Sequence, residues 1–150
     1  MAKQATTTNT ANTITAIFEA NHEVTPYATY LDWSLLATRL LIVFIFLWHG
    51  APKVFEMGMT MAMFERFGLP GILGPITGWI EVIAGLMVLV GYRYRWATAM
   101  LSIIIVGAIF TVQLPNGMTP GLERDLLILV ATLMMLAYGP GKLALDSLKK

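Results

Sequence analysis

Three ionisable residues, Glu81, Arg39 and His49, could do chemistry within apolar surroundings. Glu81 lies nine residues into an apolar run, Arg39 lies six residues into an earlier run, and His49 ends that earlier run. An ionisable group at such a position faces the interior of a helix bundle, because facing lipid is costly. Arg39, His49 and Lys53 would share one face of a helix. The spacing therefore predicts a polar contact between the two runs.

Two interpretations of this contact stay open. In the first, Arg39 and Glu81 form a structural ion pair that locks two helices together. In the second, Arg39, His49, Lys53, Glu81 and Asp125 form a polar pocket for an anionic or quinone-like ligand, and Glu81 or His49 handles protons. His49 is also a weak candidate for a haem or chlorophyll ligand through its imidazole. Asp125, near the start of the last apolar run, could instead complement a helix dipole.

Composition indicates that these residues lie in a membrane protein. Of 150 residues, 57% are hydrophobic and 13% are charged, whereas soluble domains carry about 25% charged residues. So short a chain lacks the polar residues to cover its surface in water. A net charge of +1 argues against a nucleic-acid binder. The absence of Cys excludes disulfides, thiolate catalysis and Cys-bound clusters on this chain, and two His residues make a metal site of its own unexpected.

Four apolar runs predict an all-α fold, an integral membrane four-helix bundle with a polar N-terminal extension. Their lengths approach or reach the roughly 17–25 residues that a spanning helix needs. The fourth run is the shortest. We expect residues 1–30 to form the extension, as an interfacial helix, a docking arm or a disordered tail, and residues 31–150 to form the transmembrane domain. The runs cover residues 33–49, 72–90, 96–114 and 126–138.

A stripe of glycines in the second run predicts close helix packing. Gly71, Gly74, Gly78 and Gly85 project to one side of a helix, with Glu81 at the edge of that stripe. Gly74 and Gly78 form a GxxxG pair, which lets a neighbouring backbone approach closely. Glu81 is therefore expected to point into the bundle.

The distribution of basic residues predicts the orientation. With four spans, both termini and the loop between the second and third spans lie on one side of the membrane. That side carries six Lys and Arg residues, and the other side carries three, diluted by acidic residues. The excess of basic residues favours a cytoplasmic location for both termini, in a bacterial-type cytoplasmic (inner) membrane.

The order of short motifs along the chain resembles the DoxX family of small four-helix membrane proteins. The resemblance runs from about Arg39 to Asp146, and residues 1–30 lie outside it. Ala144 stands where the family usually has Ser. The motifs are Arg39, His49-Gly50-Ala51-Pro52-Lys53, Phe67-Gly68-Leu69-Pro70, Gly78-Trp79-Ile80-Glu81, Gly91-Tyr92-Arg93, Glu123-Arg124-Asp125 and the Gly139-to-Asp146 close.

The resemblance implies a link to thiosulfate:quinone oxidoreductase and to membrane complexes that handle thiols or oxidative stress. Two functions are expected. The first is an accessory subunit that stabilises a larger respiratory or photosynthetic complex, with membrane lipids, other membrane subunits or further copies as partners. The alternative is a quinone-linked oxidoreductase component. Quinone, a lipid, or a pigment or haem shared with a partner are the candidate occupants of the bundle.

Overall fold

The computed structural model describes residues 26–148, which contain helices and no strands. Residues 34–150 form one compact unit, and residues up to 33 belong to another. The fold described below is that of the larger unit. The interfacial helix or docking arm predicted near the N-terminus falls mostly outside the described residues.

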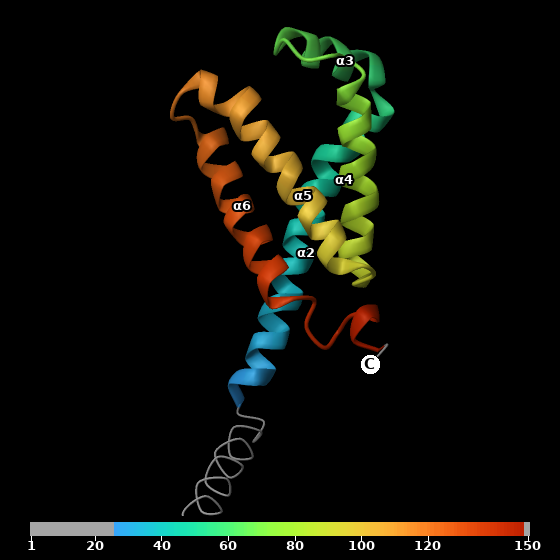
Figure 1. The fold of residues 1–150 in the computed structure, drawn as a ribbon, viewed down its shortest axis with the longest axis vertical. Coiled ribbons are helices and arrows are strands. Elements are labelled where there is room, and N and C mark those ends of the chain that lie inside the picture. The colour runs from blue at the N-terminus through green and yellow to red at the C-terminus, as the bar shows by residue number, and fades with distance from the viewer. Residues whose placement is uncertain (1–25, 149–150) are drawn as a thin grey trace, which may run out of the picture. The chain divides into compact units, whose positions relative to one another are not determined.

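Four long helices run alternately up and down (Figure 1), and the connection between the first two contains a further helix. They are α2 (Pro26–Phe55), α4 (Leu73–Val90), α5 (Tyr94–Ala108) and α6 (Pro120–Tyr138). A π-helical turn, η1 (Ile109–Gln113), and a 3-10 turn, η2 (Leu114–Asn116), extend α5, and a last 3-10 turn, η3, covers Leu145–Ser147. The predicted all-α, four-helix membrane fold is confirmed.

Three segments of the described chain are long and apolar enough to cross a membrane: Tyr30–Phe55, Leu73–Val90 and Tyr94–Asn116. The fourth helix, α6, has 19 residues, but Glu123, Arg124 and Asp125 lie in its first two turns. The sequence had marked this run as the shortest of the four. Its polar start lies at the same end of the bundle as the end of α2.

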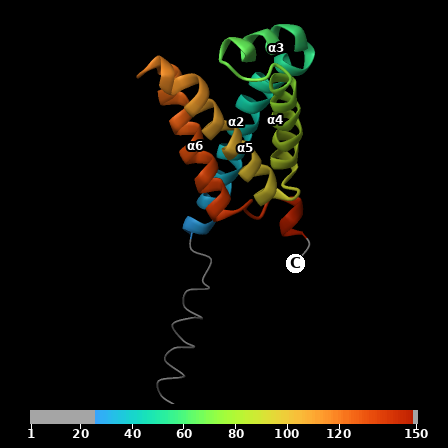
Figure 2. The same ribbon diagram turned by 45° about the horizontal axis from the view of Figure 1, so that its top comes forward.

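Helix α3 (Met57–Arg66) lies between the first and second predicted runs, where the sequence analysis expected no helix. It lies across the direction of α4 rather than along it (Figure 2). Pro52 lies inside α2 and does not end it, so the first helix continues to Phe55. We refer to this end of the molecule as the α3 end.

An apolar core holds the bundle together towards the opposite end. Phe46 of α2, Val88 of α4 and Leu101 of α5 are each at most 2% exposed. Removing such side chains from water or lipid contact and packing them densely is the main stabilising term of a helical bundle. The rest of the buried apolar set includes Ile42, Val43, Ala84, Ala97, Ile105, Ile128 and Met135.

Candidate functional site: a cavity with a polar wall

A cavity of about 600 Å³ lies between α2, α3, α4, α5 and α6 in the half of the bundle near the α3 end. Most of its wall is aliphatic or aromatic. Ile103 of α5 and Ile76 of α4 line it and are 69% and 43% exposed. Both belong to segments that are long and apolar enough to span a membrane, so we expect this wall of the cavity to face lipid.

One wall of this cavity is polar, and four of the five predicted pocket residues lie on it. His49 and Lys53 come from α2, Glu81 from α4 and Asp125 from α6. Gln113 and Arg124 line the same wall. We call these six residues the polar wall.

Lys53 and Glu81 form an ion pair across the α2–α4 contact. The Lys53 Nζ donates to Glu81 Oε1 at 2.6 Å, and the side chains are 22% and 3% exposed. The second carboxylate oxygen, Oε2, is buried without a hydrogen-bond partner among the described residues. Such an oxygen is costly to leave unpaired, so Glu81 is a carboxylate suited to accept a proton.

Two glycines allow this ion pair to form. A Cβ added to Gly78 would lie 2.6 Å from the Lys53 Cβ, and one added to Gly50 would lie 2.9 Å from the Glu81 Cβ. Both distances are too short for real contacts, so only glycine permits α2 and α4 to approach this closely. Gly78 belongs to the glycine stripe predicted from the sequence.

The other stripe glycines face α2 and α3. A Cβ at Gly74 would lie 2.6 Å from Thr60 Cγ2, and one at Gly71 would lie 2.7 Å from Glu65 Oε1. At Gly85 the nearest atom is Leu47 Cδ2 at 3.6 Å, which is an ordinary contact. The structure thus places the whole stripe against neighbouring helices, with the closest approaches around the cavity.

Asp125 is held by two donors. Gln113 Nε2 donates to Oδ2 and Arg124 Nε donates to Oδ1, both at 2.9 Å, and Asp125 is 4% exposed. Gln113 is the last residue of the π-helical turn, and such turns inside α-helices are frequent at functional sites. Gly121 leaves room for Gln113, since a Cβ there would lie 2.6 Å from Gln113 Oε1.

His49 is exposed towards the cavity and lies within electrostatic reach of Lys53, Arg124 and Asp125. Its imidazole can donate to, or accept from, a ligand in the cavity. Among residues 26–148, no three side chains of the His, Asp and Glu types gather in a group that could hold a metal ion.

Arg39 lies at the opposite end of the bundle, and the expected Arg39–Glu81 ion pair does not form. Its Nη1 donates to Pro140 O at 3.0 Å and its Nη2 to Leu143 O at 2.6 Å. Arg39 precedes Lys53 by fourteen residues, about 21 Å along a helix. The prediction ended the first span at His49, whereas the helix continues to Phe55 and brings Lys53 to the level of Glu81.

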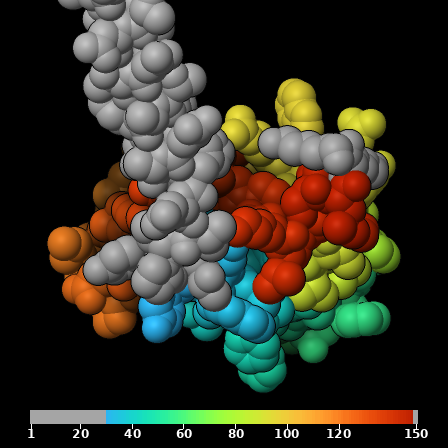
Figure 3. Space-filling model, turned by 90° about the horizontal axis from the view of Figure 1, so that it is seen from below, coloured from blue at the N-terminus to red at the C-terminus, as the bar shows by residue number. Residues whose placement is uncertain are grey.

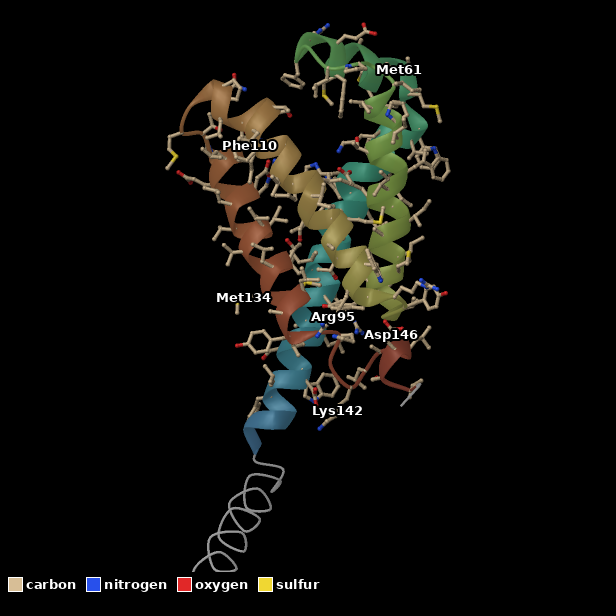
Figure 4. All side chains as sticks on the ribbon, viewed as in Figure 1. Met61, Arg95, Phe110, Met134, Lys142 and Asp146 are labelled. Atoms are coloured by element: carbon tan, nitrogen blue, oxygen red, sulfur yellow. The ribbon has the colours of Figure 1, made fainter. Side chains whose placement is uncertain are left out.

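The segment after α6, residues 139–148, is called the C-terminal strap. Asp146 accepts hydrogen bonds from the backbone N–H groups of Arg93 and Tyr94 at 3.2 and 2.9 Å, and its own N–H donates to Gly91 O at 2.9 Å. Asp146 therefore caps the start of α5 from a distant part of the chain. In Figure 3 the strap lies against the α4–α5 connection. In Figure 4, Asp146 and Lys142 lie at the end opposite Met61.

The comparisons with known proteins agree with this architecture. The DoxX family model matches residues 34–114. A protein of Bacillus subtilis (strain 168) named "Putative oxidoreductase CatD" is 32% identical over 111 residues, covering 74% of this chain and 83% of the relative.

A second relative, "Uncharacterized membrane protein Rv3486" of Mycobacterium tuberculosis (strain ATCC 25618 / H37Rv), is 31% identical over 129 residues, covering 75% of this chain and 79% of the relative. No solved structure matches the chain. The family match contains the α2–α4 ion pair and Gln113, while Asp125 and the C-terminal strap lie beyond it. On the extent of the family match and the similarity of these relatives, the chain is a member of the DoxX family of membrane proteins.

Proposed function

We propose that the cavity binds a lipid-soluble carbonyl compound of the quinone type, and that the chain serves as the quinone-binding component of a membrane oxidoreductase. The observation that carries this proposal is the pairing of an apolar, lipid-facing wall with one polar wall in a single cavity. A quinone likewise combines a polar part, the ring with its carbonyl oxygens, with an apolar part, its tail.

The polar wall offers the groups that a quinone head requires. Lys53 and His49 can donate hydrogen bonds to carbonyl oxygens, and Glu81 can take up or supply a proton. Quinone reduction and quinol oxidation exchange protons as well as electrons, so a buried carboxylate beside the head group suits either direction. The name of the Bacillus subtilis relative supports an oxidoreductase.

A cavity-filling substitution tests the proposal. Gly107 lines the cavity, and a Cβ there would meet no atom within 4 Å. Gly107→Phe should therefore occupy ligand space without a clash. Gly58 in α3 is equally open and does not line the cavity, so Gly58→Phe is the matched control.

The measurement is the thermal unfolding of purified protein in detergent, with and without decylubiquinone. A ligand at a hundredfold excess over its Kd stabilises the folded state by about 2.7 kcal/mol. The unchanged chain and Gly58→Phe should melt at a higher temperature with the quinone, and Gly107→Phe should not. An equal rise in Gly107→Phe, or no rise in the unchanged chain, would contradict the proposal.

The accessory-subunit role in a respiratory or photosynthetic complex stays a prediction, as do the inner-membrane location and cytoplasmic termini. Native mass spectrometry after gentle detergent extraction tests this role. A much heavier assembly carrying haem or chlorophyll absorption would favour it. A monomer or small homo-oligomer with bound quinone would favour the oxidoreductase component.

A further inference from the structure

Three side chains of the polar wall reach the cavity from the α3 end. Lys53 lies in the last turn of α2, Gln113 ends η1, and Asp125 lies in the second turn of α6. These three positions adjoin the connections through α3 and through residues 117–119, which Figure 1 shows at the same end of the bundle. Arg124, at the mouth of this wall, is 49% exposed in its side chain and so is open to solvent.

Between Glu81 and Arg39, the interior of the described bundle carries no acidic or basic side chain, and the weakly acidic phenol of Tyr94 is buried there. No Asp, Glu, Lys, Arg or His occurs in residues 40–48, 82–90, 96–112 or 126–137. The buried hydroxyls of Thr98, Ser102 and Thr132 donate to backbone carbonyls of their own helices. The buried Tyr94 hydroxyl interacts with the Thr98 hydroxyl, but no hydrogen bond among the described residues continues from this pair to Glu81.

The opposite end is also closed. The guanidinium of Arg39, which is 4% exposed, is bonded to two carbonyls of the C-terminal strap, and Asp146 ties the strap to the start of α5. Tyr94 and Leu101 beneath it are at most 1% exposed. Water at this end thus meets a packed apolar layer before it could reach Glu81.

We propose that the cavity is a vestibule open to water on one side of the membrane only, so that Glu81 exchanges protons with the aqueous phase at the α3 end and not with the other. The use of this route rests on the proposed function, because protons that a bound quinol gives to Glu81 would then leave on one side of the membrane. The route runs along the polar wall past Arg124 and Asp125.

Because the chain has no Cys, a single introduced thiol can report water access at a chosen place. Thr77→Cys and Thr111→Cys place the thiol on the cavity wall. Ser102→Cys places it in the buried layer, where the residue is 6% exposed. Met59→Cys on α3 and Arg95→Cys at the start of α5 mark the two aqueous sides, because both residues are exposed.

The probe is a charged, membrane-impermeant methanethiosulfonate, added to either side of sealed vesicles that hold the full chain in known orientation. It reacts with the thiolate, which needs water. Thr77→Cys and Thr111→Cys should be modified only from the side that modifies Met59→Cys. Ser102→Cys should not be modified from either side.

Three results would overturn the inference: modification of the wall thiols from the Arg95→Cys side, modification from both sides, or none from either side. Melting temperatures near that of the unchanged chain show that each variant is folded. The labelling requires no quinone, so its result can be interpreted even if the quinone proposal is wrong. If quinone stabilises the chain but the wall thiols react from both sides, only the one-sided route is wrong.

Discussion

At the scale of single residues, the Lys53–Glu81 pair is both a structural contact and part of the proposed site. Its carboxylate is 3% exposed and one of its oxygens has no partner among the described residues. Taking such a charge out of water is costly, and the attraction between the partners repays that cost only in part. A buried ion pair is therefore weak evidence of stabilisation. Whether the Lys53–Glu81 pair acts in folding or in ligand chemistry must be tested by substitution.

Two variants separate these roles. Lys53→Met leaves Glu81 buried without a cation, and removing one partner of a buried pair typically costs about 3–5 kcal/mol. Adding Glu81→Leu removes the uncompensated carboxylate, so the double variant should regain most of the stability. Thermal unfolding in detergent measures this, and the double variant should still show no rise in melting temperature with decylubiquinone. A double variant that binds the quinone normally would make the pair purely structural.

The residues of the polar wall could be predicted from sequence better than their pairing. Glu81 and His49 were identified because they lie in or at the end of an apolar run. Lys53 was added because it shares a helix face with His49, and Asp125 because it lies near the start of the last run. Arg39 met the same criterion as Glu81, yet it belongs to the other end of the bundle. Its partners are backbone carbonyls, which carry no sequence signal, and so the pattern favoured Glu81, the carboxylate inside the next apolar run.

At the scale of elements, the glycines of α4 set how closely the helices pack around the cavity. Gly78 and Gly85 lie two turns apart on the same helix, but only Gly78 is in a contact too close for a Cβ. This difference was not visible in the sequence, where both glycines belong to one stripe. It follows from the neighbours, a Lys53 Cβ at one site and a Leu47 methyl group at the other.

Gly78→Ala should therefore be destabilising and Gly85→Ala should not. Overpacking at Gly78 is expected to cost about 1–3 kcal/mol, because Lys53 and the backbone of α2 must move. At Gly85 the added methyl group meets ordinary contact distances, and Ala favours a helix over Gly by up to about 1 kcal/mol. Melting temperatures of the two variants, measured side by side, test the difference. Equal losses at both sites would contradict it.

The bounds of α4 were the most predictable of the long helices, since the predicted run of residues 72–90 agrees with Leu73–Val90. Helix α6 begins at Pro120, six residues before its predicted run, and α2 extends past its predicted run at both ends. Helix α3 was missed because it has only ten residues, which is too short for a membrane span, and the sequence was searched for spanning runs. The π-helical turn that directs Gln113 to Asp125 has no signal in the sequence at all.

At the scale of the whole molecule, the C-terminal strap ties together helices that are distant in the chain. It contacts α2 through Arg39 and the α4–α5 connection through Asp146. Both contacts lie at the end of the bundle opposite the cavity. The two ends of the bundle therefore differ: the C-terminal strap cross-links the helices at one end, and the other end carries the polar wall.

Substitutions of Asp146 should reduce stability in a graded way. Each of its two oxygens accepts one backbone N–H, so Asp146→Asn keeps one acceptor and Asp146→Ala keeps none. Loss of a helix cap costs about 0.5–2 kcal/mol, and Ala should fall at the upper part of that range with Asn between. Thermal unfolding gives the order, and an Asn variant as unstable as Ala would mean that only the carboxylate charge matters.

The orientation of the molecule in the membrane is a further prediction at this scale. Among the described residues, the end that holds the α4–α5 connection carries Arg93, Arg95 and Lys142 (Figure 4), and such an excess of basic residues faces the cytoplasm. A single thiol in Arg95→Cys should then be labelled by an impermeant reagent in inverted vesicles and not in intact cells. Labelling in intact cells would reverse the orientation and place the mouth of the cavity in the cytoplasm.

The bonds of Arg39 have a consequence for how the protein is made. Its two acceptors, Pro140 and Leu143, lie 101 and 104 residues further along the chain. When the first helix leaves the ribosome, those carbonyls have not yet been synthesised, and a charged Arg inside a membrane helix costs about 2.5–3.5 kcal/mol in insertion experiments. Until those carbonyls have been synthesised, the Arg39 side chain must extend towards the lipid head groups. The first helix to be inserted is therefore among the last to settle in its final position.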